Sequence, residues 1–146
     1  MRNVPQQGPM GCGVACVAMV IGCTYERSRR YFVRLPGNDI ERGYCCWELV
    51  WALAAAGLRF RKRTFGARTV DARLKSVPVG AIVRVRRWPG DRWLHYVVKS
   101  KTGWRDPMDS GGHSKRAKWT GSCRRGQLLR EWPRGWRPLS AIVPIG

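Results

Sequence analysis

The stretch QQGPMGCGVACVAMVIGC, residues 6–23, decides how the chain begins to fold. Glycine and proline residues stand just before Cys12, and an apolar run follows it as far as Gly22. Structure breakers, an apolar run and a closing glycine in this order are typical of a helix, here one that begins near Cys12 and ends near Gly22. We expect this helix to be buried, with Cys12 at its N-terminal end.

Length and composition indicate one folded domain. The chain has 146 residues, of which 44% are hydrophobic and 10% are aromatic. This provides enough apolar material for one core, and the chain is too short for two independent ones. We expect a single domain over residues 1–146, with a helical part over about 10–57, a β part over about 58–146 and a basic loop over about 109–126.

The balance of charge is strongly basic. The chain has 28 Lys and Arg residues against 9 Asp and Glu residues, a formal net charge of +19. Such a charge predicts attraction to an anionic partner, namely nucleic acid, an anionic lipid surface or an acidic protein. Basic residues are spread from Arg27 to Arg137 and are interleaved with tryptophans, so the sequence indicates a generally basic surface and singles out no nucleic-acid-binding residue.

Cysteine usage points to a reducing environment. The six cysteines stand at positions 12, 16, 23, 45, 46 and 123, and the chain starts MRNVPQQGP, without an apolar signal segment. We therefore expect free thiols and a cytoplasmic location, and no membrane span because no apolar run approaches the roughly 18 residues of a spanning helix. No Cys-x-x-Cys pair occurs and His95 lies far from His113 in sequence, so no metal ion or other cofactor is expected.

The rest of the chain divides into helices followed mainly by strands. Further helices are predicted over 25–33, 45–56 and 71–76, with a turn at 35–38 and a left-handed cap at Gly57. Strands are predicted over 58–63, 80–87, 94–101, 104–107 and 139–145. This order indicates an α+β domain in which N-terminal helices pack on an antiparallel sheet.

Three residues form a candidate catalytic group. Cys12 lies at a predicted helix N-terminus, where the backbone dipole favours a thiolate. A nucleophilic cysteine needs an imidazole, and the imidazole needs a third group that fixes its tautomer. His95 lies on a predicted strand and Asp106 follows eleven residues later, so a turn at 102–103 would bring the two side by side. A lone strand histidine is also common as a structural residue, and spacing alone leaves both interpretations open.

Other titratable residues are weaker candidates. Cys16 and Cys23 fit the pattern of small buried apolar side chains. Asp109 and His113 lie in a predicted polar loop. A long loop does not preorganise a base, so we expect no second catalytic group there.

The N-terminal motif resembles that of the C39 peptidases, papain-like cysteine proteases that cut leader peptides behind a double glycine. In that family a glutamine is followed by five residues and then Cys-Gly-x-Ala-Cys-x-Ala-Met, and residues 6–19 read QQGPMGCGVACVAM. The segments WELVWALAAAGLRF, VPVGAIVRV, LHYVV and DPMDSGG follow in the family's order, so the resemblance covers roughly residues 6–111. It implies a papain-like fold, a catalytic triad of Cys12, His95 and Asp106, and Gln6 as a side-chain donor in the oxyanion hole.

The resemblance implies a cysteine peptidase or hydrolase that cleaves a peptide or isopeptide bond in a peptide or protein substrate. The chain departs from the family in two places. Gly11 stands where an acidic residue is frequent, and the segment RSRRYFVRLPGNDIERG, residues 27–43, is strongly basic. The transmembrane exporter to which the best-known members are fused is not recognisable, so processing of a double-glycine leader is not implied.

Two other functions stay open. An acyltransferase would use the same triad and replace water by an amine. A catalytically idle papain-like scaffold would act through its basic surface as a structural or binding component, for example of a phage particle, and its location would then be the virion. The mixtures VRVRRWPGDRW and REWPRGWRPL favour this scaffold, because tryptophans can stack on bases beside arginines that bind phosphate.

Overall fold

The computed structural model describes residues 1–32, 43–109, 113 and 125–146. The helices are α1 (Cys12–Ile21), α2 (Tyr25–Arg29), the 3-10 turn η1 (Arg30–Phe32), α3 (Cys46–Ala55) and α4 (Val70–Ser76). The strands are β1 (Phe60–Thr64), β2 (Ile82–Arg86), β3 (His95–Ser100), β4 (Gly103–Asp106), β5 (Gln127–Leu129) and β6 (Arg137–Pro144). The helical segments predicted from the sequence are all present.

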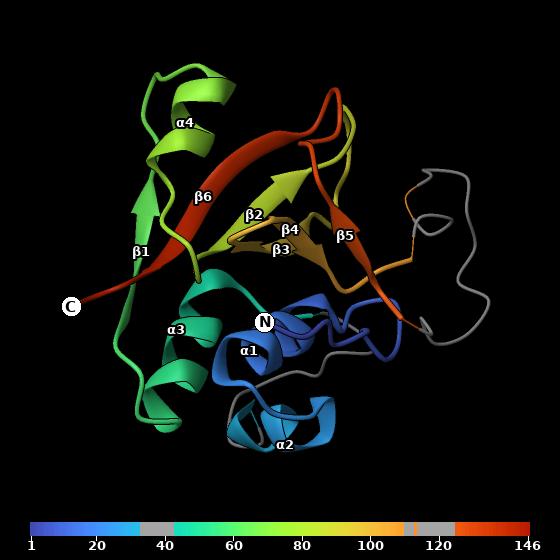
Figure 1. Cartoon of the computed structure of the whole chain (residues 1–146), viewed down its shortest axis with the longest axis vertical. Coiled ribbons are helices and arrows are strands. Elements are labelled where there is room, and N and C mark those ends of the chain that lie inside the picture. The colour runs from blue at the N-terminus through green and yellow to red at the C-terminus, as the bar shows by residue number, and fades with distance from the viewer. Residues whose placement is uncertain (33–42, 110–112, 114–124) are drawn as a thin grey trace.

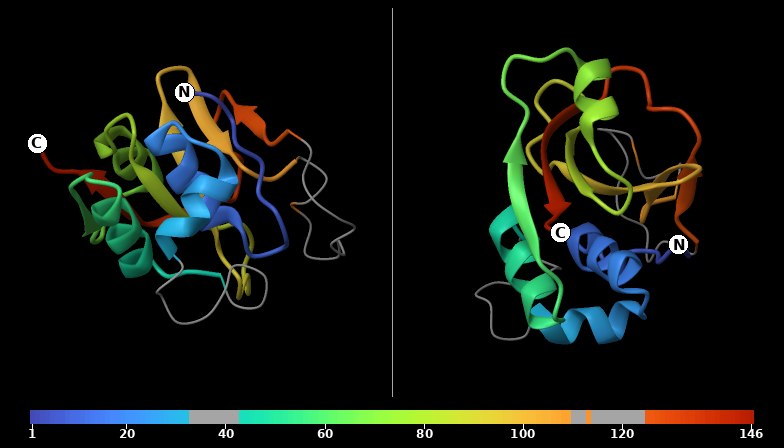
Figure 2. Two further views of the ribbon diagram at one scale, coloured as in Figure 1. Left: turned by 90° about the horizontal axis from the view of Figure 1, so that it is seen from below. Right: turned by 60° about the vertical axis from the view of Figure 1, so that its left-hand side comes forward.

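The strands form one six-stranded antiparallel sheet in the order β1-β6-β2-β3-β4-β5. Helix α1 packs on β3, and α3 packs on β1. Figure 1 shows α1, α2 and α3 together at one end of the molecule and α4 at the other end beside β6, and the views in Figure 2 agree. The predicted α+β class, with N-terminal helices on an antiparallel sheet, is therefore confirmed.

Helix α1 is the centre of the main core. Its residues from Cys12 to Met19 are buried, and most of them share one apolar cluster with Leu49 of α3 and Ile82 of β2. The helix ends where Gly22 takes a left-handed conformation with φ 81° and its N–H bonds to the Ala18 carbonyl. Glycine adopts this conformation without the steric penalty that other residues meet. Both ends of the helix lie where the sequence predicts them.

Gly11, the residue before α1, occupies a place where no side chain fits. A Cβ atom there would lie 2.4 Å from the carbonyl oxygen of Gln7 and 2.4 Å from the hydroxyl oxygen of Tyr25. The Tyr25 hydroxyl also donates to the Gln7 carbonyl at 3.2 Å, which holds α2 against this turn. This close approach explains why glycine stands directly before Cys12.

Helix α3 presents an apolar side to the core and an aromatic side to solvent. Leu49 is fully buried, whereas Trp51 is 55% exposed. The first turn is closed by the Glu48 side chain, whose Oε1 accepts the Cys45 N–H at 2.9 Å. Beyond the last turn, Gly57 takes the predicted left-handed conformation with φ 84°.

Two parts of the β region differ from the prediction. Strand β1 begins at Phe60 rather than at 58, because the Leu58 N–H still bonds back to the Leu53 carbonyl at the end of α3. Strand β5 is absent from the prediction, and it exists because its residues pair with β4. The turn predicted at 35–38 and most of the loop predicted over 109–126 lie outside the described residues.

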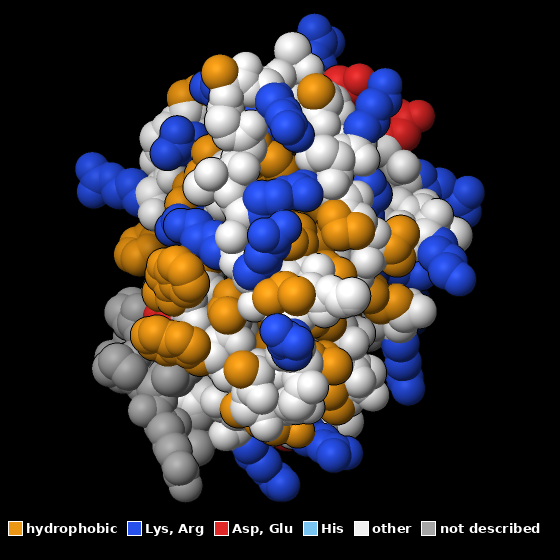
Figure 3. All heavy atoms as spheres, turned by 90° about the vertical axis from the view of Figure 1, so that its left-hand side faces the viewer, with side chains coloured by type: hydrophobic (Ala, Val, Ile, Leu, Met, Phe, Trp, Pro, Cys, Tyr) orange, Lys and Arg blue, Asp and Glu red, His pale blue; other side chains and the backbone are white. Residues whose placement is uncertain are grey.

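One face of the molecule shows how the basic charge is distributed. In Figure 3, Lys and Arg side chains are spread among apolar ones on the face that carries β1 and α4, and acidic side chains stand mainly near one edge. This face has the dispersed charge that the sequence predicts. None of the described helices combines the length and the apolar character that crossing a bilayer requires.

We expect Leu49→Ala to destabilise the protein by about 2–5 kcal/mol, because Leu49 is fully buried and its side chain reaches the space above Gly13 of α1. The matched variant Trp51→Ala lies on the exposed side of the same helix and should change stability by only about 0.5 kcal/mol. Urea denaturation followed by circular dichroism measures both values. Equal destabilisation would contradict this orientation of α3.

Candidate active site

The fold brings together the segments that carry the predicted catalytic residues. Cys12 is the first residue of α1, His95 is the first of β3 and Asp106 is the last of β4. Helix α1 packs on β3, and β3 pairs with β4 in the predicted hairpin. The backbone N–H of Gln6 donates to the carbonyl of Pro107 at 2.9 Å, so the N-terminal segment lies beside the acid.

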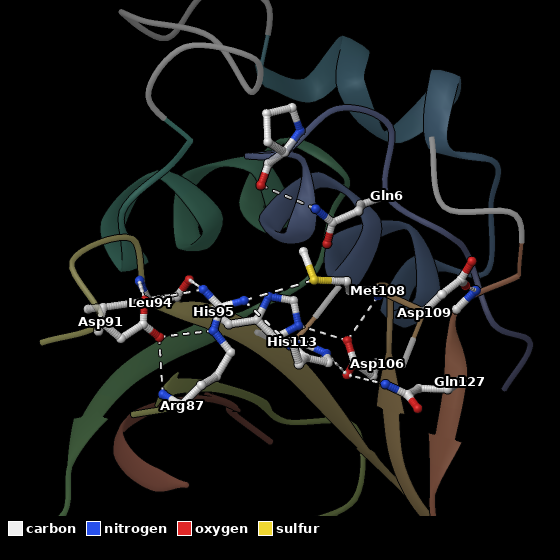
Figure 4. A network of polar contacts seen from close by, with 12 residues as sticks. Gln6, Arg87, Asp91, Leu94, His95, Asp106, Met108, Asp109, His113 and Gln127 are labelled. Atoms are coloured by element: carbon white, nitrogen blue, oxygen red, sulfur yellow. Dashed lines mark hydrogen bonds and ion pairs between the residues drawn. The ribbon is translucent and has the colours of Figure 1, made fainter. Parts of the chain in front are cut away.

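His95 and Asp106 are joined by a hydrogen bond. His95 Nε2 lies 2.7 Å from Asp106 Oδ1, and both side chains are buried (Figure 4). An ionised carboxylate only accepts, so Nε2 carries the proton and, in the neutral ring, Nδ1 keeps its lone pair. This tautomer can accept a proton at Nδ1. The prediction that the hairpin places these two residues side by side is confirmed.

Asp106 accepts further hydrogen bonds from three other groups. The Met108 N–H donates to Oδ1 at 2.9 Å, and the side-chain amide of Gln127 donates to Oδ2 at 3.1 Å. His113 Nε2 is also hydrogen-bonded to Oδ2. Figure 4 shows these groups converging on the carboxylate. Gln127 is not predictable from the sequence, because β5 itself has no clear sequence pattern.

The sequence predicts no second catalytic group in the loop that contains His113, but it does not reveal that this residue is hydrogen-bonded to Asp106. Arg87 Nη1 lies 3.4 Å from His113 Nδ1, and the Trp136 ring packs against the His113 ring at a centroid distance of 4.8 Å. Arginine only donates, so Nδ1 accepts and Nε2 carries the proton that is donated to Asp106. Contacts from distant elements fix this ring, and no local sequence pattern could have revealed them.

Hydrogen bonding keeps Asp106 ionised and burial keeps His95 neutral. Burial alone would raise the pKa of Asp106, but attraction to the His95 and His113 rings and the hydrogen bonds from them hold this pKa well below its usual range. For His95 burial is the largest effect and lowers the pKa to about 4, although Asp106 acts in the opposite direction. At neutral pH the pair consists of a carboxylate and a neutral imidazole.

Burial also governs the thiol of Cys12. The residue is 8% exposed, and burial raises its pKa to about 11. The N–H groups of Tyr96 and Gly13 and the charge of Arg87 lower this pKa, but they do not outweigh burial. The thiolate expected at a helix N-terminus is therefore not the resting form, because desolvation exceeds the effect of the helix dipole. Cys12 rests as a neutral thiol, next to the strand that carries a neutral His95.

Gln6 is fully buried, but its amide is turned toward its own loop. Nε2 donates to the carbonyl oxygens of Gly8 at 3.0 Å and Pro9 at 3.3 Å. Oε1 is buried and has no hydrogen-bond partner among the described residues. An oxyanion requires donors, and in this orientation the amide donates to the loop.

A cavity of about 280 Å³ opens beside Cys12. It is lined by the turn before α3, residues 43–45, and by residues 92–94, just before His95. Arg84 and Tyr96 line it from the sheet. The cavity gives a ligand a route to the Cys12 thiol.

A buried ion pair fixes one wall of this cavity. Arg87 and Asp91 pair at 2.9 Å, the Asp91 carboxylate accepts the Leu94 N–H at 3.2 Å, and Arg87 Nη2 donates to the Leu94 carbonyl at 3.3 Å. Between these bonds Leu94 has φ 54°, a left-handed conformation that is uncommon for a non-glycine residue. Leu94 directly precedes His95, so this ion pair also determines where β3 begins.

His95, Asp106 and His113 are the described residues best placed for a metal ion, since their ligand atoms lie within 4.8 Å of one another. A metal would need the lone pairs of the histidine nitrogens, but both Nε2 atoms carry the protons of the hydrogen bonds to Asp106. The Arg87 guanidinium beside His113 also repels a cation. The three side chains therefore fit a hydrogen-bonded network better than a metal centre.

Comparison of the chain with protein-family models, curated proteins and solved structures gave no match. The site is therefore interpreted from its own geometry. Its main features are a buried thiol at a helix N-terminus, a neutral imidazole and an ionised carboxylate.

The neutral state of His95 predicts a loss of stability on mild acidification. Its pKa falls from the usual 6.5 to about 4 in the folded protein, so between these values the unfolded chain binds a proton that the folded chain does not. The free energy of unfolding should therefore decrease as the pH is lowered through this range, by up to about 3 kcal/mol. Urea denaturation at intervals across the range measures this decrease.

The control for this experiment is His95→Gln, which removes the titrating ring. It should flatten the dependence between about pH 6.5 and pH 4, even if the variant is less stable at every pH. At lower pH protonation of Asp106 should decrease the free energy of unfolding further, because folding lowers the pKa of this residue. The same slope in both proteins would contradict a buried, neutral His95.

Proposed function

We propose that the protein is a C39-like cysteine hydrolase with a papain-like fold, which cleaves a peptide or isopeptide bond. Cys12 would be the nucleophile, His95 the base and Asp106 the residue that orients His95. The observation that carries this proposal is the hydrogen bond from His95 Nε2 to the ionised Asp106, on the hairpin against which the Cys12 helix packs. The motif in residues 6–19 supports it independently.

Attack starts from the neutral thiol. As the Cys12 sulfur bonds to the substrate carbonyl carbon, its proton passes to His95 Nδ1. The hydrogen bond from Nε2 to Asp106 stabilises the imidazolium that forms. The tetrahedral intermediate then expels the amine, which takes the proton from His95, and a thioester remains on Cys12. A water molecule that gives a proton to His95 attacks the thioester carbon. The S–C bond then breaks, the carboxylic acid leaves, and His95 returns the proton to the Cys12 sulfur.

The first turn of α1 supplies a donor for the oxyanion. The N–H of Ala15 closes a helical bond onto Gly11 at 3.1 Å. The N–H groups before it, including that of Cys12, have no intrahelical partner and can point at a negative oxygen. Gln6 adds a side-chain N–H once it is released from Pro9, which is the longer of its two bonds at 3.3 Å. Substrate binding would therefore turn the Gln6 amide from the Pro9 carbonyl to the oxyanion.

Two observations favour a second function, the catalytically idle scaffold. They are the raised pKa of the Cys12 thiol and the engagement of the Gln6 amide with its own loop. Such a scaffold would bind an anionic partner through its basic surface. An acyltransferase shares every step up to the thioester and differs only in that an amine receives the acyl group.

Cleavage of an amine-blocked tryptic peptide library tests the hydrolase. Native protein should create new free N-termini that mass spectrometry detects, Cys12→Ser should create none, and His95→Ala should create about 100-fold fewer. New termini in equal number with Cys12→Ser would contradict a nucleophilic Cys12. Peptides joined to an added amine would identify the acyltransferase. If neither new N-termini nor amine-linked peptides form, and the protein binds DNA in a salt-sensitive way, the scaffold is favoured.

With a peptide identified in this way, Gln6→Ala should lower kcat by about 10–100-fold and leave KM nearly unchanged, because an oxyanion donor acts mainly in the transition state. Gln7→Ala is the matched control, since the neighbouring glutamine is exposed. A Gln6→Ala effect on KM alone would assign this residue to substrate binding instead.

A further inference from the structure

We propose that the cavity beside Cys12 receives an acidic side chain of the substrate, so that the enzyme prefers peptides with Asp or Glu close to the scissile bond. This inference rests on the proposed function, because it assigns a substrate class to the same cysteine.

Two arginines line this cavity from different parts of the fold. Arg84 comes from β2 and is half-buried, and Arg92 comes from the segment before β3 and is exposed. A guanidinium group offers planar, paired donors that match the two oxygens of a carboxylate. The cavity therefore combines a route to the Cys12 thiol with two groups that select a negative charge.

The acidic residues close to this cavity are already engaged. Asp91 pairs with Arg87, Asp106 accepts hydrogen bonds from His95 among others, and Glu48 accepts the N–H of Cys45. Within the described ranges, no ion pair involves Arg84 or Arg92. A carboxylate of the substrate would supply the counter-ion for these two arginines.

Aromatic side chains complete the cavity. Trp93, next to Arg92, is 65% exposed, and Tyr44 also lines the cavity. Large aromatic groups at the rim of a cavity shield a bound peptide from water, and this strengthens the attraction between the arginines and a carboxylate. The lining thus fits an extended acidic peptide better than an apolar one.

Alkylation of Cys12 by two reagents of similar size and different charge tests this proposal without any substrate. In each reaction the thiolate forms an S–C bond with the methylene carbon, the C–I bond breaks and iodide leaves. The ratio of the rates with iodoacetate and iodoacetamide is read on the Cys12 peptide at about pH 9, where some thiolate exists. This ratio should exceed that of the urea-unfolded chain by about fivefold or more.

Arg84→Gln and Arg92→Gln should each reduce the excess, whereas Arg86→Gln should keep it. Arg86 lies on the same strand as Arg84, but it is exposed and does not line the cavity. Its replacement makes the same change in net charge and leaves the lining of the cavity intact. A ratio no higher than in the unfolded chain, or an equal decrease in all three variants, would overturn the proposal.

Failure of the proposed function would look different from failure of this inference. A protein that keeps the iodoacetate preference but cleaves no peptide would contradict the hydrolase and retain the carboxylate-binding cavity. In an active protein, cleavage sites should be enriched in Asp and Glu, and Arg84→Gln should weaken that enrichment more than it weakens total cleavage. Sites without such enrichment would contradict the acidic preference.

Discussion

The hydrogen bonding of one buried carboxylate is the constraint on which the site depends. An isolated carboxylate out of water would be very unstable, so Asp106 must be surrounded by donors. Those donors are His95 at the start of β3, Gln127 in β5, the Met108 N–H and His113. The need to compensate a single charge therefore ties β3, β5 and the segment after β4 to the end of β4, where Asp106 lies.

The three residues of the proposed catalytic group differ in their resting charge. Asp106 remains an anion, while burial favours a neutral imidazole at His95 and a neutral thiol at Cys12. Arg87 is the second organising residue. It pairs with Asp91, holds the Leu94 carbonyl and contacts His113, so one guanidinium links the wall of the Cys12 cavity to the Asp106 network. The hydrogen bonds among His95, Asp106 and His113 are thus already formed in the free protein, whereas the Gln6 amide is bonded to its own loop.

Much of the fold follows from local sequence patterns. The breakers before Cys12 and the glycine at 22 determine α1, and Gly57 ends α3 as its position predicts. The hairpin that places His95 beside Asp106 also follows from local turn signals. Resemblance in a short motif added Gln6 and the papain-like interpretation, neither of which periodicity alone could supply.

Most of the features that escaped prediction depend on contacts between distant parts of the chain. His113 is held by Arg87 and Trp136, and Gln127 belongs to a strand that forms only beside β4. The direction of the Cys12 pKa shift depends on how deeply the thiol is buried, and a helix N-terminus in the sequence does not report burial. The Gln6 amide is an exception, because it donates to the carbonyls of Gly8 and Pro9, only two and three residues away.

The most direct test of this account is the protonation state of the His95 ring, measured by nitrogen-15 NMR of labelled protein during a pH titration. The account predicts a neutral ring with the proton on Nε2 at neutral pH, which becomes charged only near the lowered pKa of about 4. It also predicts that Cys12→Ser leaves this titration nearly unchanged. A charged His95 ring at neutral pH that becomes neutral in Cys12→Ser would contradict it, because the resting site would then be a thiolate–imidazolium pair.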